Sequence, residues 1–217
     1  MIHPESFIKD QIPVSKWSTI PTILKSAYAA ANEIYQDNPI FQAESARYNK
    51  GRVISWAVDF GFERAIKNGA LDCDYKWTAF SKPTGRYLEL RFQHSTASIS
   101  LVSTPSRQPR PVGFRENARL RTQSVFAFPE LEKELEISGL PHFHVVHGYQ
   151  QLKFAHIAMP APDSNVRYSW LSNNLLKLPH EVKIDKDVPT ENTDYDLDQL
   201  NLLKEDIERW MKDNGSD

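Results

Sequence analysis

The hydrophobic period changes once along the chain, from three or four residues to two, and this change constrains the fold more than any other feature. Apolar side chains recur at helical spacing over residues 18–38, and Pro39 prevents the helix from continuing. A second helix is predicted over residues 50–68, with apolar residues on two sides and Gly69 where a left-handed C-cap residue is needed. A helix that is apolar on two sides packs between other elements.

The period of two begins near residue 75 and predicts β-strands. The runs "YKWTAF", "RYLELRF" and "TASISLVST" are joined by short turns, which favours an antiparallel meander. Further along, "PELEKELEIS" predicts a brief helix, and "HFHVVHGY" with "KFAHIAMPAP" predicts a hairpin that turns at residues 148–151. The expected fold class is therefore α+β, with N-terminal helices packed on an antiparallel sheet in one domain over residues 1–179.

A different composition follows this domain. Residues 180–196 are polar and acidic, which is typical of a linker. Residues 197–217 predict an amphipathic helix that is too short to be stable alone in water. It therefore needs a surface on its own domain, on a second copy or on another protein. The apolar stripe of this partner helix consists of Leu200, Leu203, Ile207 and Trp210.

The formal net charge of −2 conceals a division along the chain. Residues 1–121 carry 17 Lys and Arg against 11 Asp and Glu, whereas residues 122–217 carry 9 against 17. Such an asymmetry concerns partners rather than fold. We expect a basic surface and an acidic segment in one molecule.

Several classes of protein are disfavoured by what the sequence lacks. No apolar run approaches the ~18 residues that span a bilayer, and the first residues do not resemble a secretory signal. The lone Cys73 cannot form an intramolecular disulfide. No glycine-rich phosphate loop occurs. We therefore expect a cytoplasmic protein with no membrane partner and no cofactor.

The segment "PSRQPRPVGFRENARLR", residues 105–121, concentrates positive charge and is the main candidate binding site. Its prolines predict a loop, and its end predicts a short helical turn. Three uses remain open: phosphate binding with Phe114 and Gln108 contacting bases, docking of an acidic protein surface, or internal pinning of the loop by Arg115 and Arg119. The candidate binding residues are Arg107, Arg110, Arg115, Arg119 and Arg121.

An enzymatic interpretation rests on the order helix, three strands, helix, strand. This order resembles the core of the PD-(D/E)xK nucleases, in which acids hold Mg²⁺ and a lysine assists the attacking water. The candidates are Asp72 or Asp74 with Glu89, and Arg91 in place of the lysine. Because an arginine cannot lend a proton at neutral pH, the match is defective. The alternative is that Glu89 and Arg91 form an exposed pair on one strand face.

Three histidines form a partial metal constellation. His142 and His144 alternate onto one strand face, and His156 is expected opposite Val146 on that same face. No acid stands at a fixed spacing beside them. The alternative is that these imidazoles pack and form hydrogen bonds.

The stretches "GRYLELRF", "SISLVS", "QPRPVGFRENARLRTQSVFAF" and "LPHFHVVHGYQQLKFAHIAMPAP" carry a resemblance that covers residues 46–178. They resemble a family of uncharacterised bacterial and prophage proteins associated with genes for helix-turn-helix regulators and ImmA/IrrE-type proteases. The resemblance implies a toxin–antitoxin, phage-regulation or defence locus, and it implies no activity.

The expected function is therefore that of a non-enzymatic accessory protein. It would bind a partner protein, or form a homodimer, through the arginine segment, with nucleic acid as a further candidate partner. The alternative is a toxin directed at nucleic acid, or a Mg²⁺-dependent nuclease with a degenerate core.

Overall fold

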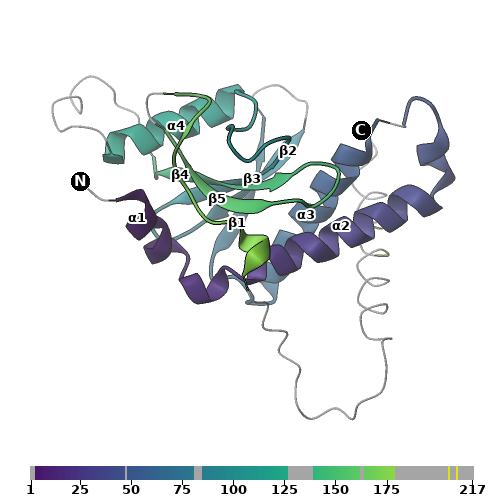
Figure 1. The fold of residues 1–217 in the computed structure, drawn as a ribbon, viewed down its shortest axis with the longest axis horizontal. Helices are drawn as coiled ribbons and strands as arrows, with labels where there is room; N and C mark the ends of the chain where they lie inside the picture. The colour runs from purple at the N-terminus through teal and green to yellow at the C-terminus, as the bar shows by residue number, and fades with distance from the viewer. Residues whose placement is uncertain are drawn as a thin grey trace, which may run out of the picture.

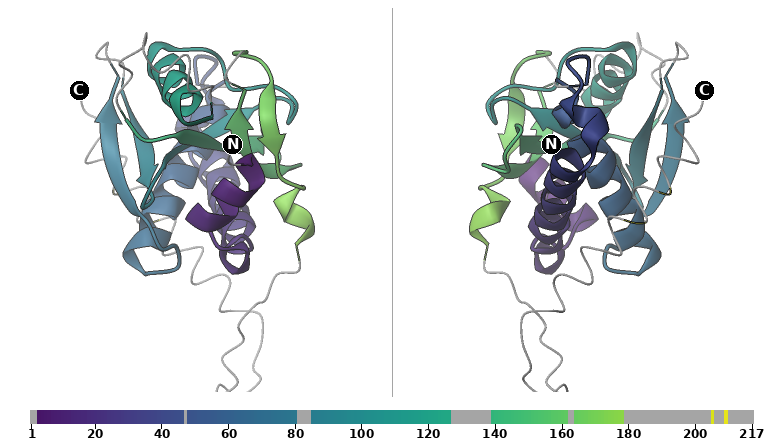
Figure 2. Two further views of the ribbon diagram at one scale, coloured as in Figure 1. Left: turned by 90° about the vertical axis from the view of Figure 1, so that its left-hand side faces the viewer. Right: turned by 90° about the vertical axis from the view of Figure 1, so that its right-hand side faces the viewer.

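The computed structural model describes residues 3–46, 48–80, 85–126, 139–161 and 164–178, together with residues 205 and 209. A six-stranded sheet lies between α4 on one face and the pair α2 and α3 on the other (Figures 1 and 2). The α+β fold class is thus confirmed. The expected helix over 129–138, the linker and the terminal apolar stripe of Leu200, Leu203, Ile207 and Trp210 lie outside the described residues.

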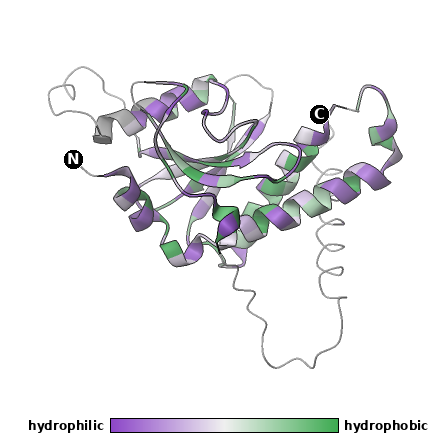
Figure 3. Cartoon of the chain, in the orientation of Figure 1, coloured by the Kyte–Doolittle hydropathy of each residue, from purple (hydrophilic) through white to green (hydrophobic). Residues whose placement is uncertain are grey.

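The two long helices follow the predicted boundaries closely. Helix α2 spans Thr19–Asp37 and α3 spans Lys50–Lys67, and green and purple segments alternate along both (Figure 3). Gly69 has a φ of +71° and ends α3 as predicted. Its N–H donates to Ile66 O at 2.9 Å, and the next N–H donates to Ala65 O at 2.8 Å. This pair of bonds satisfies carbonyls that a helix end leaves unpaired.

Helix α3 packs against both α2 and the sheet. A Cβ placed on Gly61 would lie 3.0 Å from Ile23 Cγ2 of α2, so the glycine allows the two helices to approach closely. A Cβ on Gly51 would lie 3.5 Å from Leu101 of the sheet. The central position expected for this helix is therefore confirmed.

The sheet consists of two antiparallel halves. Its first half contains β1 (Asp74–Ala79), β2 (Arg86–Arg91) and β3 (Thr96–Val102). Its second half contains β4 (His142–Gly148), β5 (Ala155–Pro160) and β6 (Tyr168–Leu171). The halves join through β3 and β4, which are parallel. A parallel pair needs a long crossover, and α4 (Gly113–Phe126) lies in that connection.

Some elements differ from the expectation. The arginine segment ends in the 14-residue helix α4 rather than in a short turn, because the helix continues beyond the last arginine. Helix α1 (Pro4–Gln11) and strand β6 were not predicted; both are short, and short elements carry little periodic signal. Three short 3-10 helices, η1 to η3, cover Val14–Lys16, Pro39–Gln42 and Leu175–Lys177. None of the described helices has the length and apolarity that crossing a membrane requires.

Strand alternation gives the sheet two unlike faces. The face toward α2 and α3 carries the apolar core. Its buried residues include Leu88, Leu90, Ala97, Phe143, Val145 and Ile157. The face toward α4 is also buried and is largely polar, apart from a small apolar cluster of Val102, Val146 and Ala158. Its buried residues include Glu89, Thr96, Ser98, Ser100, His142 and His144.

Candidate functional site

Helix α4 contacts the sheet through hydrogen bonds as well as through packing. Thr122 is 1% exposed, and its hydroxyl donates to His142 O at 2.8 Å and accepts from His142 N at 2.9 Å. One threonine therefore satisfies both backbone groups at the start of β4, where no described strand provides them. This contact sets where α4 lies across the polar face.

A continuous chain of side-chain hydrogen bonds runs beneath α4. His142 pairs through Nδ1 with Thr96 Oγ1 at 2.8 Å and through Nε2 with Ser98 Oγ at 3.1 Å. The same Ser98 hydroxyl lies 3.0 Å from His144 Nδ1. A neutral imidazole offers one donor and one acceptor, which suits alternation with hydroxyl groups.

Both histidines are neutral in the folded protein. Burial, together with the positive charges of Arg121 and Arg115, lowers the pKa of His142 to about 3. Burial, followed by His142 and Arg115, lowers the pKa of His144 well below its ordinary value. A base with so low a pKa is protonated too rarely to activate Ser98 as a nucleophile. The chain of hydrogen bonds is structural.

The metal interpretation receives no support from this arrangement. His156 does lie opposite Val146, on the same face as His142 and His144, as predicted. However, both nitrogens of His142 are engaged, and His156 Nδ1 pairs with Ser172 O at 2.8 Å. Among the described residues, no three His, Cys, Asp or Glu side chains gather where they could hold a metal ion.

Arg115 points inward from α4 and holds the preceding loop. Its Nη1 donates to Arg110 O at 2.9 Å, and its Nη2 lies 3.4 Å from Ser100 Oγ. The buried Nε has no hydrogen-bond partner among the described residues. Burial lowers the pKa of this guanidinium to about 10, so it remains a cation at neutral pH. The side chain connects the loop, the helix and β3.

An aromatic cluster supports the same region from the side of β1 and β2. The rings of Tyr87 and Phe114 stack with centroids 4.1 Å apart, and Phe80 lies 5.4 Å from Phe114. The Arg115 guanidinium carbon lies 4.9 Å from the centroid of Phe114. Phe114, which the sequence offered as a platform for a nucleic-acid base, is thus packed against three neighbours.

Gln108 attaches the loop to the turn between β5 and β6. Its N–H donates to Val166 O at 2.9 Å, and its side-chain amide donates to Ser164 O at 3.0 Å and to Arg167 O. Tyr168 adds a hydroxyl that donates to Arg107 O at 2.9 Å. The sequence offered Gln108 as a reader of bases, but its amide is already used to order the loop.

These contacts sort the five arginines into two groups. Arg107 and Arg110 are exposed, and neither forms an ion pair with a described residue. Arg119 is half-buried and pairs with Glu116, with Nη2 and Oε2 3.1 Å apart. Arg121 packs against Gly139, where an added Cβ would lie 2.8 Å from its Cδ. The expectation that residues 105–121 form one exposed positive surface is therefore corrected, because α4 turns its arginines toward the sheet and toward its own acid.

A third exposed arginine lies beside the loop. Arg167 belongs to the segment to which Gln108 is bonded. We call the exposed set Arg107, Arg110 and Arg167 the arginine edge. Its aliphatic neighbours Val112 and Val166 are 36% and 47% exposed. No sequence signal pointed to Arg167, because this contact joins residues about 60 positions apart and only the fold brings them together.

Three of the nuclease candidates, Asp74, Glu89 and Arg91, lie on one face of β1 and β2, but the arginine pairs with Glu89. Asp74 lies opposite Arg91 in the register of β1 and β2. Arg91 Nε donates to Glu89 Oε1 at 3.0 Å, and Glu89 is buried whereas Asp74 is exposed. Ser98 of β3 lies directly opposite Glu89, so a hydroxyl stands where a second acid would be needed.

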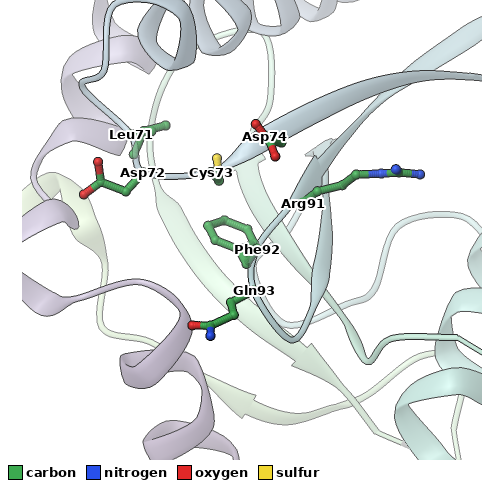
Figure 4. A pocket seen from close by; sticks show the side chains of 7 residues that line it. All are labelled: Leu71, Asp72, Cys73, Asp74, Arg91, Phe92 and Gln93. Carbon is green, nitrogen blue, oxygen red and sulfur yellow. The ribbon is translucent and has the colours of Figure 1, made fainter.

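A pocket of about 430 Å³ opens where β1 begins and β2 ends (Figure 4). Asp74, Arg91 and Cys73 help to line it, but Asp72 and Arg91 point to opposite sides (Figure 4). Burial, with Asp74 and Asp72 nearby, raises the pKa of the Cys73 thiol to about 12. A thiol with that pKa is not a nucleophile at neutral pH. The pocket lacks the convergent polar groups of an active site.

Compared with protein-family models, with curated proteins and with solved structures, the chain matches none. On the geometry of the described residues, the arginine edge is the candidate site.

Proposed function

We propose that this protein is an accessory binding protein that docks an anionic macromolecular partner through the arginine edge. The observation that carries the proposal is that the backbone of this loop is fixed while the side chains of Arg107 and Arg110 are exposed. Gln108, Tyr168 and Arg115 hold the loop from within, while Arg107 and Arg110 extend from it without a described ion-pair partner.

A fixed loop favours binding for a physical reason. Ordering a flexible segment on association costs free energy, and a loop that is already ordered avoids part of that cost. Guanidinium groups also bind carboxylates and phosphates in a bidentate geometry. An accessory role of this kind agrees with what the resemblance to the prophage family implies.

Charge reversal tests the proposal. The variant Arg107→Glu/Arg110→Glu/Arg167→Glu is compared with Arg52→Glu/Lys153→Glu/Lys177→Glu, which makes the same change of charge at exposed cations elsewhere. Two probes are titrated at low salt by fluorescence anisotropy, a polyglutamate peptide and a single-stranded oligothymidylate. We expect the first variant to lose at least about tenfold in affinity for the better-bound probe, and the control to lose much less. Equal losses in both variants would reject a localised site.

A nuclease remains the second candidate, because one observation favours it. Helix α3, strands β1 to β3, helix α4 and strand β4 occur in the order that the nuclease interpretation requires. If this candidate holds, Glu89→Ala and Asp74→Ala each abolish Mg²⁺-dependent cleavage of a labelled oligonucleotide while circular dichroism stays unchanged. Activity that survives both substitutions, or no activity in the wild type, rejects it.

A further inference from the structure

We infer that the partner at the arginine edge is a protein segment that combines acidic and aliphatic side chains, rather than a nucleic acid. The inference rests on the proposed function and names the chemistry of its partner. Three observations carry it: the engagement of the base-reading groups, the small number of exposed cations, and the exposed aliphatic side chains close to those cations in the sequence.

The groups that would recognise bases are already used within the molecule. Single-stranded nucleic acids bind proteins largely by stacking bases on aromatic rings. Here Phe114 contacts Tyr87, Phe80 and the Arg115 guanidinium. The amide of Gln108 is bonded to the backbone of the β5–β6 turn. Among the described residues of the loop, the exposed arginines and their phosphate contacts would remain for a nucleic acid.

Phosphate contacts alone would be weak at this surface. Affinity without base contacts grows with the number of phosphates that a protein neutralises, and three arginines correspond to a logarithmic salt slope of only about −2 to −3. The whole chain has a formal net charge of −2, so its long-range field does not attract a polyanion. A short acidic segment responds to the local charges instead.

The aliphatic side chains give the surface a second component. Val112 follows Arg110 by two positions and Val166 precedes Arg167, and both are substantially exposed. Gln108 bonds to Val166 O, which places that valine beside the loop. Exposed aliphatic carbon on the same segments as the arginines complements a protein that alternates acids with leucine, isoleucine or valine, because both components are then desolvated together.

Three probes of equal net charge test the inference on the full chain. One peptide alternates glutamate with leucine, a second has serine in place of leucine, and the third probe is single-stranded oligothymidylate. We expect the glutamate–leucine peptide to bind several-fold more tightly than either of the others at the same ionic strength. Val112→Ser/Val166→Ser should remove this preference and leave the affinity for the glutamate–serine peptide unchanged.

A matched variant controls for general effects of removing exposed aliphatic carbon. Val14→Ser/Leu140→Ser removes side chains that are 52% and 43% exposed outside the arginine edge, and it should preserve the preference. Tighter binding of the oligothymidylate, or equal binding of the two peptides, overturns the inference. Either result leaves the proposed function standing as long as charge reversal of the arginine edge still abolishes binding.

The acidic residues of this chain's own C-terminal segment have related chemistry, since residues 181–217 carry 12 Asp and Glu against 5 Lys and Arg. Replacing those acids by Asn and Gln in the full chain separates the two sources. Unchanged affinity for the glutamate–leucine peptide supports a partner protein. A clear gain in affinity would mean that the surface is occupied from within the chain, and would overturn the assignment.

Discussion

The two faces of the sheet are both buried, but different interactions dominate on each. The face under α2 and α3 excludes water with Phe143, Leu90 and their neighbours, whereas the face under α4 carries Ser98 and two neutral histidines. Burying polar groups adds stability only while every hydrogen bond is made. The apolar face therefore stabilises the fold, and the polar face positions α4 and the loop before it. Any treatment that disturbs hydrogen bonds should affect the second face first.

Acid should produce the largest loss of stability, because the buried neutral histidines become protonated when the chain unfolds. Burial lowers the pKa of His142 and of His147 to about 3 from an ordinary value of 6.5, and it also lowers the pKa of His144. Between these pKa values, the histidines bind protons in the unfolded chain but not in the folded chain. Stability is fully present above pH 6.5 and is lost as the pH falls toward 3, by up to about 1.4 kcal/mol per pH unit for each histidine.

Urea denaturation across this range measures the effect. His142→Asn/His144→Asn should flatten the pH dependence more than His147→Gln, which removes the one histidine of the three that lies on the apolar face and pairs with Tyr28. A slope that the double variant leaves unchanged would contradict the account of the polar face.

Truncation in the apolar face should give the next largest effect. Phe143 is fully buried, and Phe143→Ala should lower the free energy of unfolding by about 3–5 kcal/mol through lost transfer energy and the cavity that remains. The exposed Tyr149 is the control for removing an aromatic ring. Thermal or urea denaturation checks both variants, and similar losses would contradict the location of the core.

A smaller effect is expected from Thr122→Val, which keeps the side-chain volume. The substitution leaves His142 N and His142 O without the partner that Thr122 provides. We expect a loss of about 1–3 kcal/mol, because buried polar groups would be unpaired. Hydrogen exchange should show faster exchange in α4 before any change in α2. Equally faster hydrogen exchange throughout the chain would contradict a local role of Thr122 in holding α4 on the sheet.

The smallest effect on global stability should come from Arg115→Lys. Lysine keeps the charge but loses the paired contacts to Arg110 O and Ser100 Oγ, so about 1–2 kcal/mol is expected. The amide of Gln108, which donates to Val166 O, should exchange faster than in the wild type. An unchanged exchange rate at Gln108 would show that Arg115 does not order the loop.

Local patterns predicted most of the elements. The 3.6-residue period, Pro39 and Gly69 located α2 and α3, and alternation located the strands, because these signals arise from neighbouring residues. The parallel pairing of β3 with β4 was not predicted from the sequence, because it joins segments that are far apart in the chain. Short elements such as β6 gave too few residues for a period to show.

The candidate site was predictable only in part. The density of arginine marked residues 105–121, but charge alone does not say which guanidinium groups face the solvent. That distinction depends on how α4 rotates over the sheet, which Thr122 and Arg115 fix through contacts with His142 and Ser100. Arg167 was missed because only the bond between Gln108 and the β5–β6 turn brings it to the loop.

One measurement tests most directly the central claim, that the polar face acts through the loop it holds. In a double-mutant cycle, the affinity for the glutamate–leucine peptide is measured for the wild type, Arg115→Met, Arg107→Ala/Arg110→Ala and the combined variant. The account predicts that Arg115→Met weakens binding severalfold in the wild-type background and has almost no effect once Arg107 and Arg110 are absent. Equal losses in both backgrounds would contradict it, because Arg115 would then contact the partner directly, and no loss in either would show that the buried face has no part in binding.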